Sequence, residues 1–87
     1  MIESRATRRF WRLFSALPAD VQEDAREAYK RFRTNPNHPS LHFKKLEGEG
    51  NIYSVRIGLN YRAVAAVGGN RAVWYWIGDH DGYDRLT

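Results

Sequence analysis

Residues 52–77 read IYSVRIGLNYRAVAAVGGNRAVWYWI, and this stretch decides the fold class. It contains three segments rich in β-branched and aromatic residues, at 52–57, 61–67 and 71–77. Only Gly58-Leu59-Asn60 and Gly68-Gly69-Asn70 separate these segments. Links this short form hairpins and cannot carry the crossovers of a parallel sheet. The stretch therefore predicts three antiparallel strands.

Two amphipathic helices are predicted ahead of these strands. Within residues 18–34, apolar side chains recur on one stripe, at Val21, Ala25, Ala28, Tyr29 and Phe32. Pro18 suits the first turn of a helix, and Asp20 lies where negative charge is favoured. Residues 4–16 predict a shorter helix, because apolar side chains recur there at helical spacing, at Phe10, Leu13, Phe14 and Leu17.

The connection between helices and sheet is rich in turn formers. Residues 34–40 contain two prolines, which predicts an irregular connector. Residues 41–46 form a fourth strand candidate, followed by the link Gly48-Glu49-Gly50-Asn51. The predicted fold is α+β, with two N-terminal helices packed on one face of a mainly antiparallel four-stranded sheet. At this length we expect a single domain over residues 1–87.

The charge of the chain is unevenly distributed. The formal net charge is +4, and residues 1–46 hold ten Lys and Arg against five Asp and Glu, whereas residues 47–87 hold four against five. Clustered cations favour a polyanionic partner, either nucleic acid or an acidic protein, because binding releases counterions. An ordinary solvated surface is the alternative interpretation.

Several classes of protein are excluded by composition. The chain has no cysteine, which rules out a disulfide framework and a cysteine-ligated zinc site. No stretch approaches the roughly 20 apolar residues of a membrane span, and the first residues lack the apolar run of a secretory signal. We therefore expect a cytoplasmic protein that does not contact a membrane.

The strand predicted at 52–57 has two different faces. Tyr53, Val55 and Ile57 alternate with Ser54 and Arg56. Successive side chains of a strand point to opposite faces, so the apolar set is expected to pack against the helices. Arg56 then lies on the opposite, open face of the sheet, which becomes a candidate binding surface.

A series of motifs accompanies the order of two helices and four short strands and covers essentially the whole chain: Leu17-Pro18, Lys45-Leu46-Glu47-Gly48, Tyr53-Ser54-Val55-Arg56-Ile57-Gly58, Tyr61-Arg62, and Trp74-Tyr75-Trp76-Ile77-Gly78 leading to His80 and Tyr83. In this order and spacing, the motifs resemble those of the RelE/ParE family of toxins. The resemblance implies a RelE-like, microbial ribonuclease-type fold and a toxin of a type II toxin-antitoxin system. It favours the RelE branch, whose members enter the ribosomal A site and cut mRNA.

Metal-free RNA cleavage needs a base for the ribose 2′-hydroxyl, positive charge at the phosphate and an acid for the departing 5′-oxygen. Arg62 matches the family's phosphate-contacting arginine, and its permanently charged, planar guanidinium suits this role. Arg56 matches a basic position that would hold RNA backbone near Arg62. Some relatives have another basic residue two positions earlier, where this chain has Ser54, so the charge cluster is weaker. A surface ion pair for Arg62 and ordinary strand surface for Arg56 are the alternatives.

His80 and Tyr83 follow the last predicted strand, where the family carries further catalytic residues. An imidazole that titrates near neutral pH serves as acid or base, and Asp79 and Asp81 beside it would favour its charged form and hence the acid role. Tyr83 matches a C-terminal tyrosine that stacks on a base or assists proton transfer in related toxins. The alternatives are a solvated loop histidine and a tyrosine that only packs the tail onto the sheet.

Other polar and aromatic residues receive lesser roles. The remaining basic groups are interpreted as electrostatic contacts to RNA or to an antitoxin, with solubility as the alternative: Lys44, Lys45, Arg5, Arg8, Arg9 and Arg12. His38 and His42 do not lie on a predicted helix, so a metal site there is rejected, and neither metal nor cofactor is expected. Trp74 and Trp76 are expected to share one strand face, as core or as antitoxin-docking surface.

Three functions are compatible with these motifs. The first is an endoribonuclease that acts on ribosome-bound mRNA through Arg62, His80 and Tyr83. The second is a ParE-like, non-enzymatic inhibitor of DNA gyrase, because one fold supports several functions. The third is an inactive relative that only binds its antitoxin and operator DNA. The expected partners are a cognate antitoxin, the ribosome and mRNA, with operator DNA bound only through the antitoxin.

Overall fold

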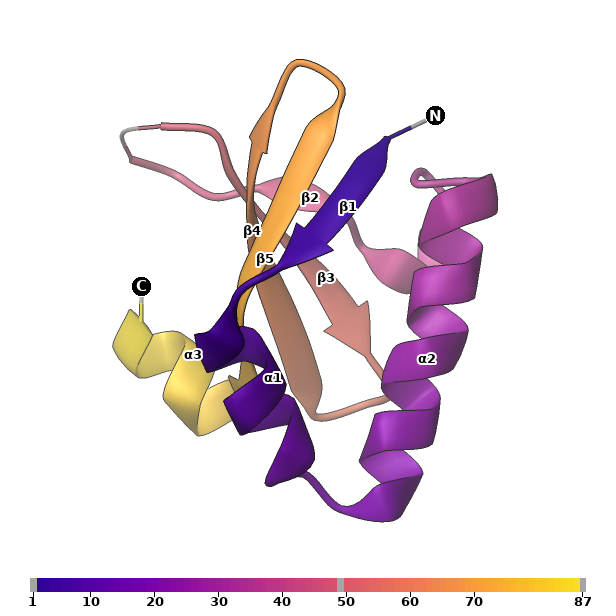
Figure 1. The fold of residues 1–87 in the computed structure, drawn as a ribbon, viewed down its shortest axis with the longest axis vertical. Helices are drawn as coiled ribbons and strands as arrows, with labels where there is room; N and C mark the ends of the chain where they lie inside the picture. Colours follow the sequence, from indigo (N-terminus) through magenta and orange to yellow (C-terminus); the bar gives the residue numbers. More distant parts are fainter. Residues whose placement is uncertain (1, 49, 87) are drawn as a thin grey trace.

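The computed structural model describes residues 2–48 and 50–86, so Glu49 of the predicted link lies outside the described residues. The strands form a five-stranded sheet in the order β1-β5-β4-β3-β2, shown in Figure 1. β3 (Ile52–Ile57), β4 (Tyr61–Gly68) and β5 (Arg71–Asp79) are antiparallel neighbours, as their apolar segments predict. The α+β class is confirmed, with one strand more than expected.

The additional strand is β1 (Glu3–Ala6), which pairs in parallel with the start of β5. The prediction of a helix from residue 4 is therefore wrong at its N-terminal end, because α1 spans only Arg8–Ser15. Thr7 Oγ1 accepts a hydrogen bond from the Phe10 amide at 3.1 Å and caps this helix. Pairing with a distant segment, together with this cap, sets the boundary between strand and helix.

The second helix, α2 (Ala19–Thr34), agrees with the helix predicted at 18–34. It lies with α1 on one side of the sheet (Figure 1). Its Phe32 is buried and packs edge-on against Phe43 and Trp74, with ring centres 5.2 and 5.3 Å apart. Removing the Phe32 ring would destabilise the fold by about 3–5 kcal/mol. None of the described helices is long and apolar enough to cross a membrane.

The segment predicted as a strand at 41–46 is largely irregular. A 3₁₀ turn, η1 (Pro39–Leu41), places Leu41 in the core, and β2 is limited to Lys44–Lys45. His42 has a positive φ of 46°, which is incompatible with an extended strand. The predicted six-residue strand is therefore wrong in its first half, because the chain must turn to bury Leu41.

A third helix, α3 (His80–Leu86), follows β5, where the sequence predicts only a tail. Its Tyr83 contacts Trp76 and the Ser54 hydroxyl. Ser54 alternates with the core residue Val55, so α3 lies on the face opposite α1 and α2. We call this second face, which carries Ser54, Arg56, Arg62 and Trp76, the open face, although α3 covers part of it.

A bulge in β5 separates two of the tryptophans. Val64 is paired with Trp76, but the next residue, Ala65, is paired with Trp74, so Tyr75 is left over in β5. The prediction that Trp74 and Trp76 share one face is therefore wrong. Trp74 belongs to the core beneath α2, whereas Trp76 lies on the open face beneath α3.

Candidate functional site

The sheet strands place three of the predicted site residues on the open face. Arg56 of β3 is paired with Arg62 of β4, and Lys44 of β2 is paired with Ser54 of β3. Directly paired residues of antiparallel strands project from the same face, and Ser54 and Arg56 both alternate with the buried Val55. Lys44, Arg56 and Arg62 therefore lie on one face of the sheet.

The guanidinium of Arg62 is oriented by two neighbours. Its Nη1 donates a long hydrogen bond of 3.4 Å to the Ser54 hydroxyl, and its Cζ lies 5.3 Å from the centre of the Tyr83 ring. An aromatic face orients a guanidinium without neutralising its charge. Among the described residues, the ion pairs all lie elsewhere on the exposed surface, and none includes Arg62. Its charge is therefore available to an anion.

Arg56 places a second positive charge opposite Arg62. Its Nε donates a hydrogen bond of 3.0 Å to the Gly58 carbonyl, which holds the side chain near the end of β3. Like charges at directly paired positions repel each other. A phosphate group bound at this point would relieve the repulsion and accept hydrogen bonds from both guanidinium groups.

Ser54 connects the sheet to α3. The side chain is 0% exposed, and its hydroxyl accepts a long hydrogen bond of 3.5 Å from the Tyr83 hydroxyl in addition to the one from Arg62. The Tyr83 ring also lies 6.4 Å from Trp76, in a tilted arrangement. From the sequence, Ser54 is only a gap in the basic cluster. Ser54 is two residues before Arg56, so the same alternation could have predicted that its side chain lies on the open face.

His80 is the first residue of α3 and is not part of a loop. Its amide donates to the Asn60 carbonyl at 3.1 Å, which fixes the helix start beside the β3–β4 turn. The imidazole is exposed, and no described contact joins it to Arg62. The Asp79 carboxylate accepts a hydrogen bond of 2.9 Å from the Gly82 amide and caps α3. This capping role was missed from the sequence, although an aspartate is among the residues preferred at the position before a helix.

The two lysines of β2 project from different faces. Lys45 is paired with Tyr53, whose ring stacks on Phe43 on the side covered by the helices. Lys44 is paired with Ser54 on the open face. Of the two lysines, only Lys44 therefore projects from the same face as Arg62.

The remaining predicted basic residues and the connector histidines lie away from the open face. Arg5 pairs with Glu3 at 3.3 Å, and the other N-terminal arginines are on α1, on the opposite side of the sheet: Arg8, Arg9 and Arg12. His38 Nδ1 accepts a hydrogen bond of 3.2 Å from the Ser40 amide and caps η1. Within the described ranges, no group of three His, Cys, Asp or Glu residues is placed to hold a metal ion.

Comparisons with known proteins agree with this architecture. The family model of the ParE-like toxin domain matches residues 19–85. A chain of the RelB-RelE antitoxin-toxin complex from Methanococcus jannaschii is similar with a TM-score of 0.76 and 19% identity, over 95% of this chain and 99% of that one. YafQ from E. coli is similar with a TM-score of 0.76 and 6% identity, over 95% and 98% of the two chains.

The isolated E. coli RelE toxin is similar over 100% of both chains, with a TM-score of 0.71 and 15% identity. At such low identities these structures show a shared fold. None of the curated protein sequences matches the chain significantly.

Proposed function

Because the chain belongs to the ParE-like toxin domain family, we propose that it is the toxin of a type II toxin-antitoxin system and that it cleaves mRNA on the ribosome. One observation carries the proposal of RNA cleavage. The Arg62 guanidinium is oriented on the open face by Ser54 and Tyr83, and no described carboxylate neutralises it.

In the proposed reaction, the 2′-hydroxyl of a ribose gives its proton to a solvent water molecule and attacks the adjacent phosphorus, which forms a 2′,3′-cyclic phosphate as the bond to the 5′-oxygen of the next nucleotide breaks. Negative charge accumulates on the phosphate oxygens as the new bond forms. Arg62 stabilises this charge, because a fixed guanidinium needs little reorganisation in the transition state. Arg56 and Lys44 on the same face bind the neighbouring phosphates.

His80 is the proposed proton-transfer group, and we assign it the protonation of the departing 5′-oxygen. Its exposed imidazole at the start of α3 is accessible to RNA that lies along the open face. Tyr83 holds Arg62 through its ring and offers an aromatic surface for a base. Lys45 projects from the other face, so we leave it out of the RNA site.

The proposed partner in the cell is a protein antitoxin. The similar chain from Methanococcus jannaschii comes from an antitoxin-toxin complex, which supports this assignment. The basic N-terminal half of the chain suits an acidic partner. Contact with operator DNA would then depend on the antitoxin.

The test is to map the 5′ ends of mRNA on ribosomes after induction of the wild type, Arg62→Ala and His80→Ala. We expect cuts in the A-site codon with the wild type, a fall of about 10²–10³-fold for Arg62→Ala and a fall of about 10²–10⁴-fold for His80→Ala. A folded double variant that still cuts at the full rate would refute the site. Induction that triggers DNA-damage signalling without translational arrest would instead support inhibition of gyrase.

A further inference from the structure

The open face carries a small hollow near Arg62 that the proposed reaction does not use. It measures about 230 Å³ and lies between the link that follows β2, the sheet and the C-terminal end of α3. Its lining includes Val64, which is two residues after Arg62 on the same face of β4, or roughly 7 Å along the strand. Leu86 borders it on α3, three residues after Tyr83 and hence on the same side of that helix. An RNA strand whose phosphate is bound at Arg62 therefore passes close to the hollow.

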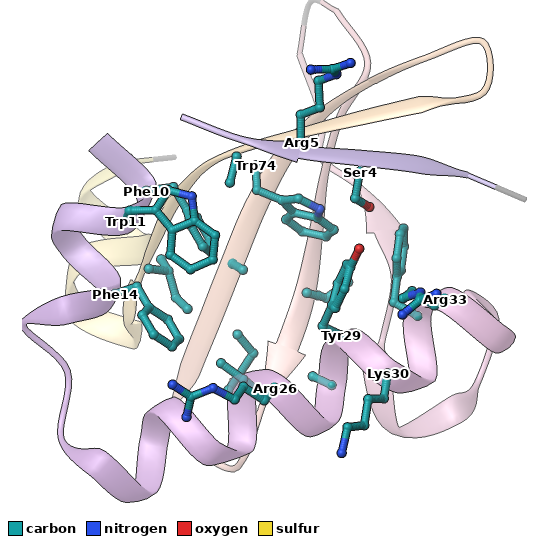
Figure 2. A pocket seen from close by; sticks show the side chains of 18 residues that line it. Ser4, Arg5, Phe10, Trp11, Phe14, Arg26, Tyr29, Lys30, Arg33 and Trp74 are labelled. Carbon is teal, nitrogen blue, oxygen red and sulfur yellow. The ribbon is translucent and has the colours of Figure 1, made fainter. Parts of the chain in front are cut away.

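The bulge in β5 supplies an aromatic side chain to this hollow. Trp74 projects toward α1 and α2 on the opposite side of the sheet, as Figure 2 shows. In regular alternation Trp76 would project from that side too. Because Tyr75 is the extra residue of the bulge, Trp76 packs on the open face beside Tyr83, and Tyr75 lines the hollow. Bulges are frequent beside functional sites, where they redirect a side chain, and this one brings two consecutive aromatic residues to the open face.

The charge of the hollow differs from that of the Arg62 site. Among the described residues that line it, Glu47 alone is charged, and none of the described ion pairs includes it. A carboxylate repels a phosphate group, so the hollow does not suit the backbone of RNA. It suits a base, because the Tyr75 ring can stack on a base and the Glu47 carboxylate can accept hydrogen bonds from an amino group. Cytosine, adenine and guanine have such an amino group, whereas uracil has none.

We propose that this hollow binds one nucleobase next to the phosphate at Arg62, and that Glu47 and Tyr75 make it select a base with an amino group over uracil. The inference rests on the proposed function, since it names the part of the RNA substrate that this face reads. Arg62 and its basic neighbours contact phosphates, which are the same in every nucleotide, so they position RNA without distinguishing its sequence. Glu47 is then the specificity-determining residue.

The probes are two short oligonucleotides, one of cytidine and one of uridine, with 2′-O-methyl riboses that prevent cleavage. The two bases have rings of equal size, so a difference in affinity reports the amino group. Fluorescence anisotropy with the wild-type chain should show about tenfold tighter binding of the cytidine oligomer. Glu47→Gln should lose this preference, because an amide offers both a donor and an acceptor and therefore pairs with uracil as well. The matched control is Glu27→Gln on the exposed surface of α2, which changes the net charge equally and should keep the preference.

Tyr75 is tested through the surface of its ring. Tyr75→Phe keeps an aromatic surface and should bind the cytidine oligomer like the wild type, whereas Tyr75→Leu should bind it about tenfold more weakly. Wild-type affinity in Tyr75→Leu would overturn the stacking role. Glu47 is exposed, so Glu47→Gln should fold normally and decides the rest. A wild type that binds neither oligomer or both equally, a preference that survives in Glu47→Gln, or one that is also lost in Glu27→Gln would each overturn the proposal.

Mapping of mRNA cuts on ribosomes separates this inference from the proposed function. Cuts by the wild type should favour cytosine over uracil at one fixed position beside the cut, and Glu47→Gln should lose that preference. If the wild type cuts no mRNA but prefers the cytidine oligomer through Glu47, the proposed cleavage fails and the hollow stands as a base-binding site. If mRNA is cut and neither the cuts nor oligonucleotide binding depend on Glu47, the base-binding site fails alone.

Discussion

The hydroxyl of Ser54 is a small group with two important contacts. It is fully buried and accepts hydrogen bonds from Arg62 and from Tyr83, at 3.4 and 3.5 Å. Each bond is long, so neither is expected to contribute much to stability. Their joint effect is positional, because they connect the guanidinium of the sheet with the phenol of α3. Ser54 is therefore proposed as a positioning residue.

Ser54→Ala should lower RNA cleavage about tenfold to a hundredfold, because a displaced guanidinium no longer meets the phosphate correctly. The free energy of unfolding should change by no more than about 1 kcal/mol, since alanine fits the same buried space. Cleavage on ribosomes and urea unfolding measure the two effects. The matched control is Ser15→Ala on the exposed end of α1, which should change neither. Wild-type cleavage by Ser54→Ala would contradict the positioning role.

At the scale of elements, α3 is held by a single described cap. The Asp79 carboxylate accepts the Gly82 amide at 2.9 Å, and the helix is only seven residues long. A helix this short depends on its cap and on packing, because its own hydrogen bonds barely compensate the ordering of the chain. Both His80 and Tyr83 lie on this helix, so its stability determines whether Tyr83 keeps its contacts with the open face and where His80 is held.

Asp79→Ala should destabilise α3 by about 1 kcal/mol. Hydrogen exchange of the Gly82 and Tyr83 amides should therefore become faster, while the amides of β4 keep their protection. Asp79→Asn is the matched control, because asparagine retains the capping oxygen and should exchange at nearly the wild-type rate. Equal exchange rates in all three proteins would show that Asp79 does not hold the helix.

The elements predicted correctly are those whose pattern is local. The apolar stripe of α2 and the short glycine-containing links around β4 lie within a few residues, so periodicity and turn chemistry predict them. β1 is different, because Glu3–Ala6 becomes a strand only by pairing with Arg71–Trp74. The bulge at Tyr75 is also set by the partner strand. Long-range pairing therefore accounts for the missed strand, and the extra residue in β5 accounts for the wrong face assigned to one tryptophan.

In the candidate site too, local patterns predicted some features and contacts between distant residues were missed. Period-two alternation predicted that Arg56 lies on the open face, whereas the position of Arg62 near it came from the family resemblance. The structure places the two residues directly opposite each other. The buried contact of Ser54 with Tyr83 joins residues far apart in the sequence, so no local pattern indicates it. The assignment of His80 rests on family resemblance, and no geometric pattern in the sequence would have selected it.

At the scale of the whole molecule, the positive charge is divided between two faces of one sheet. Lys44, Arg56 and Arg62 lie on the open face, whereas Arg26 and Arg33 belong to α2 on the opposite side of the sheet. Long-range attraction depends on the total charge, but contacts to phosphate depend on which face the RNA occupies. Two variants of equal net charge, one altered on each side of the sheet, can therefore separate long-range attraction from direct contacts to phosphate.

We expect Lys44→Glu/Arg56→Glu to weaken binding of a short single-stranded RNA and to reduce the slope of log K against log salt concentration by about 0.7 for each phosphate that the variant no longer neutralises. Arg26→Glu/Arg33→Glu lowers the net charge by the same amount but removes no proposed RNA-binding group, so its slope should stay close to that of the wild type. Fluorescence anisotropy over a range of salt concentrations measures both slopes. If affinity and slope fall equally in the two variants, RNA responds to the total charge of the chain, and the open face is not its specific binding surface.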